Sequence, residues 1–338
     1  MIVRMATPQP GIFALGTRSQ YQMEFDLLGK PAADALGAAL TAVMTPENVP
    51  GGANVVVGLG PRAFVALGAD APDDYAGFEA ITGADGRHAP STQHDLWVWI
   101  QWTGEDRLWE AARDTAAALA GVAELAFELA TFEYADGRDL TGFKDGTENP
   151  ATDMREAAAI VADGAHAGGS YVIVQKWVHR LDEFEALPVQ EQEKVFGRTK
   201  AGDIELSDET KPPTAHNARN VIEDGDGNEL KIWRRNSRFG GVAENGAIFV
   251  GFACEPERLD RMLRRMFNAD GDGLFDRFTD FSDAVTGARY FVPAIEALTA
   301  MGVAPGQDGG DGDADAGSEP GSAYGDGEGA LGVGSLRD

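Results

Sequence analysis

The segment over residues 142–150, which reads GFKDGTENP, concentrates groups suited to chemistry near the middle of the chain. It places two glycines, one lysine and two carboxylates between a strand-like stretch and a helical one. Gly142 and Gly146 can adopt backbone angles that other residues avoid, so the loop can bend sharply and approach a flat ligand closely. Asp145 stands at the tightest part of that bend. A simpler interpretation is a helix start, in which Asp145 is only a solvated turn residue.

His216 is the one histidine of five that lies on a stiff segment, KPPTAHNARN. Two prolines precede it, and Thr214 can cap a short helical turn. A metal ligand must be held in a defined geometry, which such a segment can supply. No second histidine or cysteine is placed for chelation, which disfavours a bare zinc site. A haem iron, in contrast, needs only one protein ligand, and histidine is common in that role. A purely structural histidine is the alternative.

Arg234 and Asn236, in the segment IWRRNSRFG, share one face of a predicted strand because they stand two residues apart. An arginine and an amide on one face can line a pocket. The alternative is a solvated strand face, which is the more usual place for arginine.

Asp280 and Asp283 lie between aromatic residues in the segment FTDFSDAVTGARYFVP. An aspartate in such surroundings is either a turn residue or a buried hydrogen-bond partner, and the sequence favours neither interpretation. Both residues therefore remain candidates for a polar role inside the protein.

The composition limits the classes of partner. The formal net charge of the 338 residues is −27, which makes nucleic acid and anionic membranes poor partners. The single cysteine, Cys254, excludes internal disulfides and cysteine-rich metal sites, as is common in a reducing cytoplasm. We find neither an export signal at the N-terminus nor an apolar run long enough to span a membrane.

The hydrophobic pattern predicts the order β-α-β-β-α-β twice, which is the ferredoxin-like arrangement. In the first half we expect strands or extended chain at 11–28, 54–59, 95–102 and 123–134, with helices at 32–44, 61–67 and 106–120. In the second half we expect strands at 170–178, 230–235, 247–254 and 288–292, with helices at 181–195, interrupted by a proline, and at 256–267. The sequence thus predicts an α+β protein of two ferredoxin-like halves with antiparallel sheets, over residues 1–140 and 141–300.

Residues 301–338 differ in composition from the rest of the chain. They are mostly Gly, Asp, Ala, Ser and Glu until apolar residues return in the final ALGVGSLRD. A segment of this kind cannot bury enough apolar surface to fold by itself. An acidic spacer that ends in a short apolar segment, residues 330–338, is typical of a tethered docking peptide, and a frayed terminus is the alternative.

Together these features resemble the dye-decolourising peroxidase family. The loop at residues 142–146 matches its G-x-x-D-G signature, and His216, the R-x-N at 234–236 and the segment DFSDAVTGARYFVP follow in the family's order. The resemblance extends over about residues 8 to 300 and is closest to the compact bacterial members that lack an export signal.

The resemblance implies a haem b between the central loop and a proximal histidine, which would be His216. Asp280 would accept the other ring N–H of this histidine, as carboxylates near metal ligands do. Asp145 would act as acid–base group toward bound hydrogen peroxide, Arg234 would stabilise charge on the leaving oxygen, and Asn236 would orient the peroxide or a water.

The resemblance also implies partners for the cofactor and for the reaction. The haem propionates need cationic or hydrogen-bonding partners, for which Arg198 and Arg219 are candidates. An organic electron donor such as a dye or a phenol would be oxidised, with bulky donors reacting through surface Trp or Tyr residues. Because the base is a carboxylate, we expect an acidic optimum, and we expect a homo-oligomer.

The end of the chain resembles the cargo-loading peptide of encapsulin shells. Leu331, Val333 and Leu336, spaced by glycine and serine, match its short pattern of apolar residues and glycine. Peroxidases of this family are a recognised cargo class, so the resemblance implies a cytoplasmic enzyme inside an encapsulin nanocompartment.

Two other functions fit the same residues. A haem-binding or iron-release protein with little peroxidase turnover could use the same pocket, with Asp145 only as a loop residue. A haem-free ferredoxin-like interaction module would make His216 structural. Turnover with peroxide and a reducing dye separates the first alternative from a peroxidase, and a Soret band excludes the second.

Overall fold

The computed structural model describes residues 6–44 and 54–304. The predicted docking residues Leu331, Val333 and Leu336 lie outside the described residues. The first half contains η1 (Pro10–Ile12), β1 (Ser19–Leu27), α1 (Ala33–Met44), β2 (Asn54–Leu59), α2 (Pro61–Leu67), β3 (Ile81–Thr82), β4 (His88–Ala89), β5 (Leu96–Trp102), α3 (Glu105–Leu119) and β6 (Ala123–Phe132). Every strand and helix predicted for this half is present, and the β3–β4 hairpin is an addition.

The second half has longer connections between its strands and helices. It contains α4 (Arg155–Ala159), β7 (Ser170–His179), α5 (Leu181–Glu185), α6 (Val189–Phe196), α7 (His216–Asn220), β8 (Trp233–Arg234), β9 (Ser237–Gly240), β10 (Asn245–Ala253), α8 (Pro256–Met266), η2 (Arg277–Asp280), β11 (Ser282–Ala284), β12 (Ala288–Val292) and α9 (Ile295–Ala300). The break between α5 and α6 falls at Pro188, which occupies the N-cap of α6. The α+β architecture of two ferredoxin-like halves is thereby confirmed.

Apart from β3 and β4, which pair only with each other, the described strands of both halves form one sheet rather than two separate ones. Their order is β11-β7-β12-β2-β5-β1-β6-β9-β10-β8, and β10 also pairs with β7, so the sheet curls back on itself. The halves join where β6 pairs with β9 and where β12 pairs with β2. All of these pairings are antiparallel.

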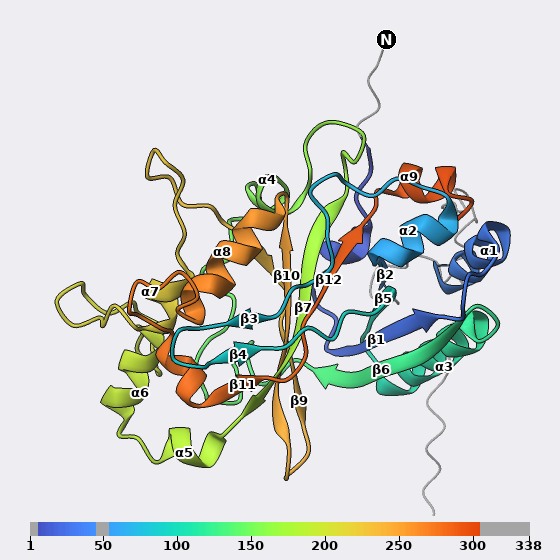
Figure 1. Ribbon diagram of the computed structural model, residues 1–338. Coiled ribbons are helices and arrows are strands. Elements are labelled where there is room, and N and C mark those ends of the chain that lie inside the picture. Colours follow the sequence, from blue (N-terminus) through green and yellow to red (C-terminus); the bar gives the residue numbers. More distant parts are fainter. Residues whose placement is uncertain (1–5, 45–53, 305–338) are drawn as a thin grey trace, which may run out of the picture. The chain divides into compact units, whose positions relative to one another are not determined.

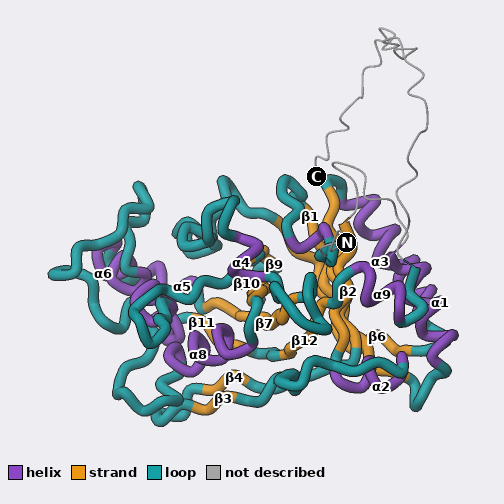
Figure 2. Tube along the Cα trace, turned by 90° about the horizontal axis from the view of Figure 1, so that it is seen from above, coloured by secondary structure: helices purple, strands orange, loops and turns teal. Residues whose placement is uncertain are grey.

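The helices form two groups on opposite sides of the strands. Figures 1 and 2 show α5, α6, α7 and α8 beyond β7 and β10, and α1, α2, α3 and α9 beyond β2, β5, β1 and β6. Since strand residues alternate between faces, β7 and β10 present one set of side chains to the interior of the curled sheet and another set to α8. The second set forms one wall of the site described below.

Buried aromatic side chains fill the interior of the curled sheet. Trp97 stacks on Trp99 with ring centroids 5.9 Å apart, and on Tyr290 with centroids 6.1 Å apart. The Tyr290 hydroxyl donates to the fully buried carboxylate of Glu24. Desolvation raises the pKa of Glu24 to about 7, against the lowering effect of this hydrogen bond.

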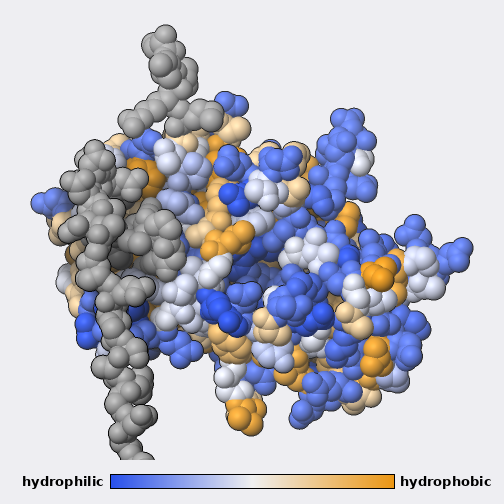
Figure 3. Space-filling model, turned by 180° about the vertical axis from the view of Figure 1, so that it is seen from behind, coloured by the Kyte–Doolittle hydropathy of each residue, from blue (hydrophilic) through white to orange (hydrophobic). Residues whose placement is uncertain are grey.

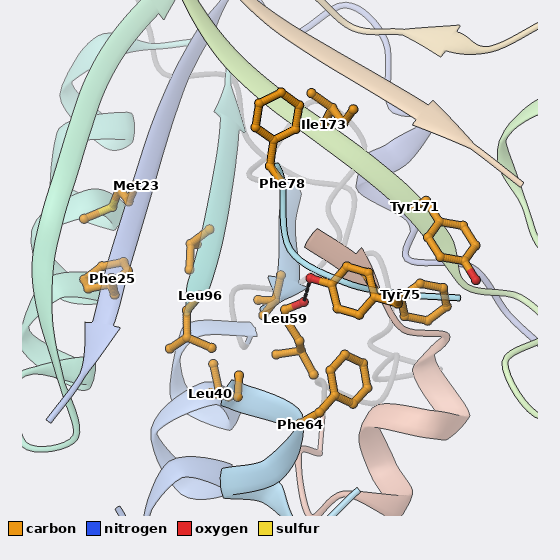
Figure 4. Close-up of a cluster of buried hydrophobic side chains, with 14 of the residues drawn as sticks. Met23, Phe25, Leu40, Leu59, Phe64, Tyr75, Phe78, Leu96, Tyr171 and Ile173 are labelled. Atoms are coloured by element: carbon orange, nitrogen blue, oxygen red, sulfur yellow. Dashed lines mark hydrogen bonds between the residues drawn. The ribbon is translucent and has the colours of Figure 1, made fainter. Parts of the chain in front are cut away.

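A second core lies between the strands and the helices of the first half. Figure 4 shows Leu40 and Phe64 from the helices facing Phe25, Leu59 and other strand residues, with a hydrogen bond from the Tyr75 hydroxyl to the Leu59 carbonyl, 2.7 Å long. Burial of side chains of this size stabilises the fold by roughly 1.5–3 kcal/mol each before ordering costs. This packing holds the first half against the strands that carry the site.

The surface in Figure 3 is mainly hydrophilic, with hydrophobic residues scattered between charged ones. In the part of the chain that the structure describes, no helix combines the length and the apolar character needed to cross a lipid bilayer.

Candidate functional site

A cavity lies between the outer face of β7 and β10, helices α7 and α8, and the central loop. It encloses an empty volume of about 790 Å³, including its open mouth. Its wall combines apolar and aromatic side chains with a few polar ones, among them Asp145, His216, Arg234 and Asn236. Residues that the sequence places far apart are thus brought to one cavity, although their roles do not follow from proximity alone.

The central loop has the sharp bend that its glycines predict. Gly142 has φ +86° and Gly146 has φ +77°, angles that other residues rarely adopt. A Cβ at Gly142 would also lie 2.7 Å from Cε of Lys200, so both the angle and the space favour glycine. The bend turns Asp145 toward the cavity, and the simpler interpretation of a solvated turn residue is wrong for this side chain, which lines the cavity wall.

Two side chains and one backbone N–H donate to the carboxylate of Asp145. Oδ2 accepts from Nη2 of Arg238 at 2.6 Å and from Nδ2 of Asn236 at 3.1 Å, and Oδ1 accepts from the N–H of Gly146 at 2.7 Å. Desolvation acts to raise the pKa of Asp145, but the charges of Arg238 and Arg234 outweigh it and hold the pKa below its usual value. The carboxylate is therefore ionised at neutral and mildly acidic pH.

Asp139 continues this group of charges. Its Oδ2 lies 3.2 Å from Nε of Arg238 and 3.2 Å from Nε2 of His179. His179 in turn lies 2.7 Å from Oγ of Ser282 through Nδ1. Desolvation acts to raise the pKa of Asp139, but His179, Arg238 and the N–H of Thr141 lower it well below the usual range. Asp139 and His179 both line the cavity.

His216 begins the short helix α7, and its ring lines the cavity. Nδ1 lies 2.6 Å from Oδ2 of Asp276, which is fully buried. A carboxylate at Nδ1 selects the tautomer that carries the proton there and leaves the lone pair on Nε2. Phe196 and Phe278 pack edge-on against the imidazole, with centroids 5.8 and 5.5 Å away, and fix its plane.

The carboxylate partner of His216 is Asp276, so the prediction of Asp280 was wrong. Asp276 caps η2 and accepts from the N–H of Phe278 through Oδ1, which leaves Oδ2 directed at the imidazole. Asp280 lies one turn later and pairs with Arg87 at 2.8 Å. Asp283 pairs with Arg180.

The two candidate arginines for a cofactor's carboxylates have different surroundings. Arg219 is buried, and its guanidinium donates to the carbonyls of Arg265 and Leu274 and pairs with Asp272. These contacts contradict the prediction that Arg219 binds a haem propionate. Arg198 lines a neighbouring cavity of about 740 Å³ that also reaches His216. Its guanidinium is held by Glu148 at 2.6 Å and Asp203 at 2.7 Å.

Several buried polar atoms around the cavity lack a protein partner. They are Nε of Arg234, Nη1 of Arg238, and both Nε2 and Oε1 of Gln175 on β7. Arg234 and Gln175 line the cavity itself. Because buried polar groups are nearly always hydrogen-bonded, these atoms indicate a site made for a bound molecule or water. Within residues 6–44 and 54–304, no cluster of three or more His, Cys, Asp or Glu is arranged to hold a metal ion.

The sequence analysis missed Arg238, Asp139, His179 and Asp276 as parts of the site. The alternation that pairs Arg234 with Asn236 would have reached Arg238 if continued by one more step. The other residues carried no comparable signal, because each becomes part of the site only through contacts across the fold.

Comparisons with known proteins agree with this geometry. The model of the N-terminal part of Dyp-type peroxidases matches residues 31–133, and that of the C-terminal part matches residues 136–297. A dye-decolorizing peroxidase of Rhodococcus erythropolis is 43% identical over 253 residues, which are 73% of this chain and 74% of the relative.

Solved structures extend the likeness over nearly the whole described chain. A dyp-type peroxidase protein from Shewanella oneidensis superposes with a TM-score of 0.82 at 30% identity, covering 88% of this chain and 99% of that one. A variant of Rhodococcus jostii RHA1 DypB in complex with heme superposes with a TM-score of 0.79 at 34% identity, covering 87% and 98%. With both family models matched and a close relative covered over most of its length, the chain belongs to the dye-decolourising (Dyp-type) peroxidase family.

Proposed function

We propose that this protein binds haem b in the cavity lined by His216 and Asp145 and uses hydrogen peroxide to oxidise an organic electron donor. The pair of His216 and the buried Asp276 carries the proposal, because such a pair is the usual support of a metal-bound imidazole. A related DypB has been solved with heme, which supports the choice of cofactor.

The residues present fit this cofactor. His216 would hold the iron through Nε2, whose lone pair the hydrogen bond at Nδ1 preserves. The amide of Asn220 lies 3.2 Å from Nε2 and has to give up that contact, while its 2.7 Å bond to the His216 carbonyl remains. When bound, the haem supplies the iron at which the peroxide O–O bond is cleaved and the oxidising equivalents passed to the donor.

Asp145, Arg234 and Asn236 do the acid–base and electrostatic work. Cleaving peroxide into water requires that a proton move from one peroxide oxygen to the other. Asp145 is ionised and accepts this proton, and afterwards donates it to the departing oxygen. Arg234, with a buried Nε that has no protein partner, stabilises the negative charge that develops there. The Asn236 amide donates to Asp145, and its Oδ1 accepts from the N–H of Val250, so its plane is fixed.

The cavity beside the site can accommodate the polar edge of the cofactor. Arg198, Lys231 and Arg258 line this second cavity and give its wall cationic groups. Arg198 is therefore the candidate for a propionate partner, in exchange for part of its contact with Glu148. Bulky donors, which are too large for the buried site, give up electrons at surface Trp or Tyr residues.

We also propose that the terminal segment 330–338 docks the enzyme to an encapsulin shell, which would place it in a cytoplasmic nanocompartment. The support is the sequence: an acidic spacer ends in Leu331, Val333 and Leu336 among small residues. A spacer rich in Gly residues gives reach, and apolar side chains at alternate positions can fill pockets on a partner. A homo-oligomer would present several such peptides at once, which strengthens binding through avidity.

The test of the main proposal compares haem binding and turnover. The full-length chain should bind haem with a Soret band, and it should oxidise a dye with hydrogen peroxide. His216→Ala should lose most of the bound haem, whereas His88→Ala, at an exposed position of β4, should keep it. Full haem occupancy with an unchanged spectrum in His216→Ala would contradict the ligand assignment. A wild-type protein that binds haem without turnover would instead favour haem storage or release.

A further inference from the structure

The side chain of Arg238 occupies the space between Asp145 and a second acidic group. It is 3% exposed and belongs to β9, two residues beyond Asn236. We propose that Arg238 is a positioning residue for the peroxidase reaction: held in place by the Arg138 carbonyl and Asp139, it fixes one oxygen of Asp145 and places a positive charge beside that carboxylate. The inference rests on the proposed function for its role in the reaction, but the geometry of the charges stands by itself.

Arg238 is held from two sides. Nη2 donates to Oδ2 of Asp145 at 2.6 Å, and Nε donates to the carbonyl of Arg138 at 3.1 Å and lies 3.2 Å from Oδ2 of Asp139. A planar guanidinium held at several donors cannot rotate without breaking all of these contacts. The position of Asp145 Oδ2 is therefore set by β9 as well as by the central loop.

Asp139 is itself fixed, so it can serve as an anchor. Its Oδ1 accepts from the N–H of Thr141 at 2.9 Å and from the hydroxyl of Thr141 at 2.7 Å. Its Oδ2 faces His179, whose ring is held by Ser282 and packs edge-on against Phe278 with centroids 5.4 Å apart. The chain of contacts runs from Ser282 through His179, Asp139 and Arg238 to Asp145, across four separate segments.

This arrangement also selects the oxygen of Asp145 that takes the proton. Oδ2 accepts two hydrogen bonds, from Arg238 and Asn236, which use both of its lone pairs. Oδ1 accepts one short bond from Gly146 and a longer 3.3 Å contact from Asn236. Oδ1 therefore keeps the more available lone pair and is the proton acceptor.

The two arginines near Asp145 have different tasks. Arg234 lines the cavity and has an unpartnered Nε, which suits a group that binds peroxide. Arg238 lies in the wall of another cavity, of about 770 Å³, that reaches Asp145 from the side of β6. Its Nη2 donates to Asp145 and its Nε to the carbonyl of Arg138, while Nη1 has no protein partner. One arginine thus contacts the substrate and the other controls the base.

The charges that face Asp145 predict pKa shifts of opposite sign for two different variants. Arg238 and Arg234 favour its ionised form, and Asp139 disfavours it. His179 faces Asp139 rather than Asp145, and Lys144 is turned to Asp136. Removal of Arg238 should therefore raise the pKa of Asp145, whereas removal of the Asp139 charge should lower it. A merely structural role of the pair would not give shifts in opposite directions.

The experiment titrates the Asp145 carboxyl in the full-length chain by infrared difference spectroscopy, with Asp145→Asn to assign the band. Arg238→Gln should raise the pKa by about 1–3 units, the range for loss of a neighbouring cation. Arg238→Lys should restore most of the wild-type value, and Asp139→Asn should lower it. Arg107→Gln, in an exposed pair with Glu110, controls for net charge and should change nothing.

The reaction rate with peroxide provides the second measurement. The acidic limb of the pH–rate profile should move to higher pH in Arg238→Gln by the same amount as the pKa, and to lower pH in Asp139→Asn. If the infrared pKa is the same in wild type and Arg238→Gln, the inference is wrong. It is also wrong if the pKa moves while the acidic limb does not. Should Arg238→Gln fail to fold, Asp139→Asn still tests the inference, because an unchanged or raised pKa of Asp145 in that variant would contradict it. Wild type without peroxide turnover would contradict the proposed function instead.

Discussion

Nδ1 of His216 and Oδ2 of Asp276 lie 2.6 Å apart across the end of the cavity wall, and Asp276 has no exposed surface. The pair joins the start of α7 to the start of η2, sixty residues later in the chain. Such a contact does two things at once: it fixes the ring, and it keeps Nε2 unprotonated.

Asp276→Asn should weaken haem binding or activity by about 10–100-fold, because a neutral amide is a poorer acceptor for the imidazole N–H. Asp280→Asn is the matched control, since Asp280 pairs with Arg87 rather than with His216. Haem affinity and the iron–histidine stretching frequency, measured by resonance Raman spectroscopy, would distinguish the two variants. Equal effects of both would mean that Asp276 is not the partner that matters.

Asp145→Asn should slow the spectral change on mixing with hydrogen peroxide by about 10²–10⁴-fold, the usual contribution of general acid–base catalysis. Arg234→Leu should slow it by about 10²–10³-fold through lost charge stabilisation. Both variants should still bind haem, because neither residue touches His216 or Asp276. Stopped-flow measurements give these rates, and reaction of both variants at the wild-type rate would refute their assigned roles.

Glu24 should make the folded protein less stable as the pH rises from about 4.5 to about 7. Its pKa is about 7 in the folded protein against an ordinary value of 4.5, so the folded state holds a proton that the unfolded state has lost in this window. Above pH 7 the penalty is complete and no longer changes. In Glu24→Gln this pH dependence should disappear, as seen in the unfolding temperature between pH 4 and 8, whereas Glu110→Gln should retain it.

Removal of residues 330–338 should leave peroxidase activity unchanged and abolish co-purification with an encapsulin shell. Each buried Leu or Val side chain contributes roughly 1.5–3 kcal/mol before ordering costs, so a single peptide binds modestly and several bind firmly. Leu336→Asp should have nearly the same effect, because a charge cannot occupy an apolar pocket. If the shortened enzyme is still encapsulated as well as the full chain, the segment has no docking role.

Much of the fold was predictable because its signals are local. The strands at 54–59 and 288–292 and the helix at 61–67 have the predicted bounds, since apolar periodicity and flanking glycine or proline act within a few residues. The strand expected at 230–235 is shorter, Trp233–Arg234 only, and the backbone N–H of Leu230 bonds to the carbonyl of Ile222 instead of to β10. The two halves share one curled sheet because strands from distant segments pair with each other. The hydrophobic periodicity of a segment does not indicate which distant strand it pairs with.

The candidate site likewise has features that the sequence predicts and features that depend on tertiary contacts. The sequence by itself determined the bend at Gly142 and Gly146, and it singled out Asp145 and His216 by residue type and local stiffness. Only the tertiary structure decided that Asp276 rather than Asp280 faces His216. The two aspartates are four residues apart with similar neighbours, and the choice depends on which one caps η2 and which one meets Arg87, a residue from the other half of the chain. Packing between distant segments decides which side chains become partners, and the sequence of a single segment does not indicate that packing.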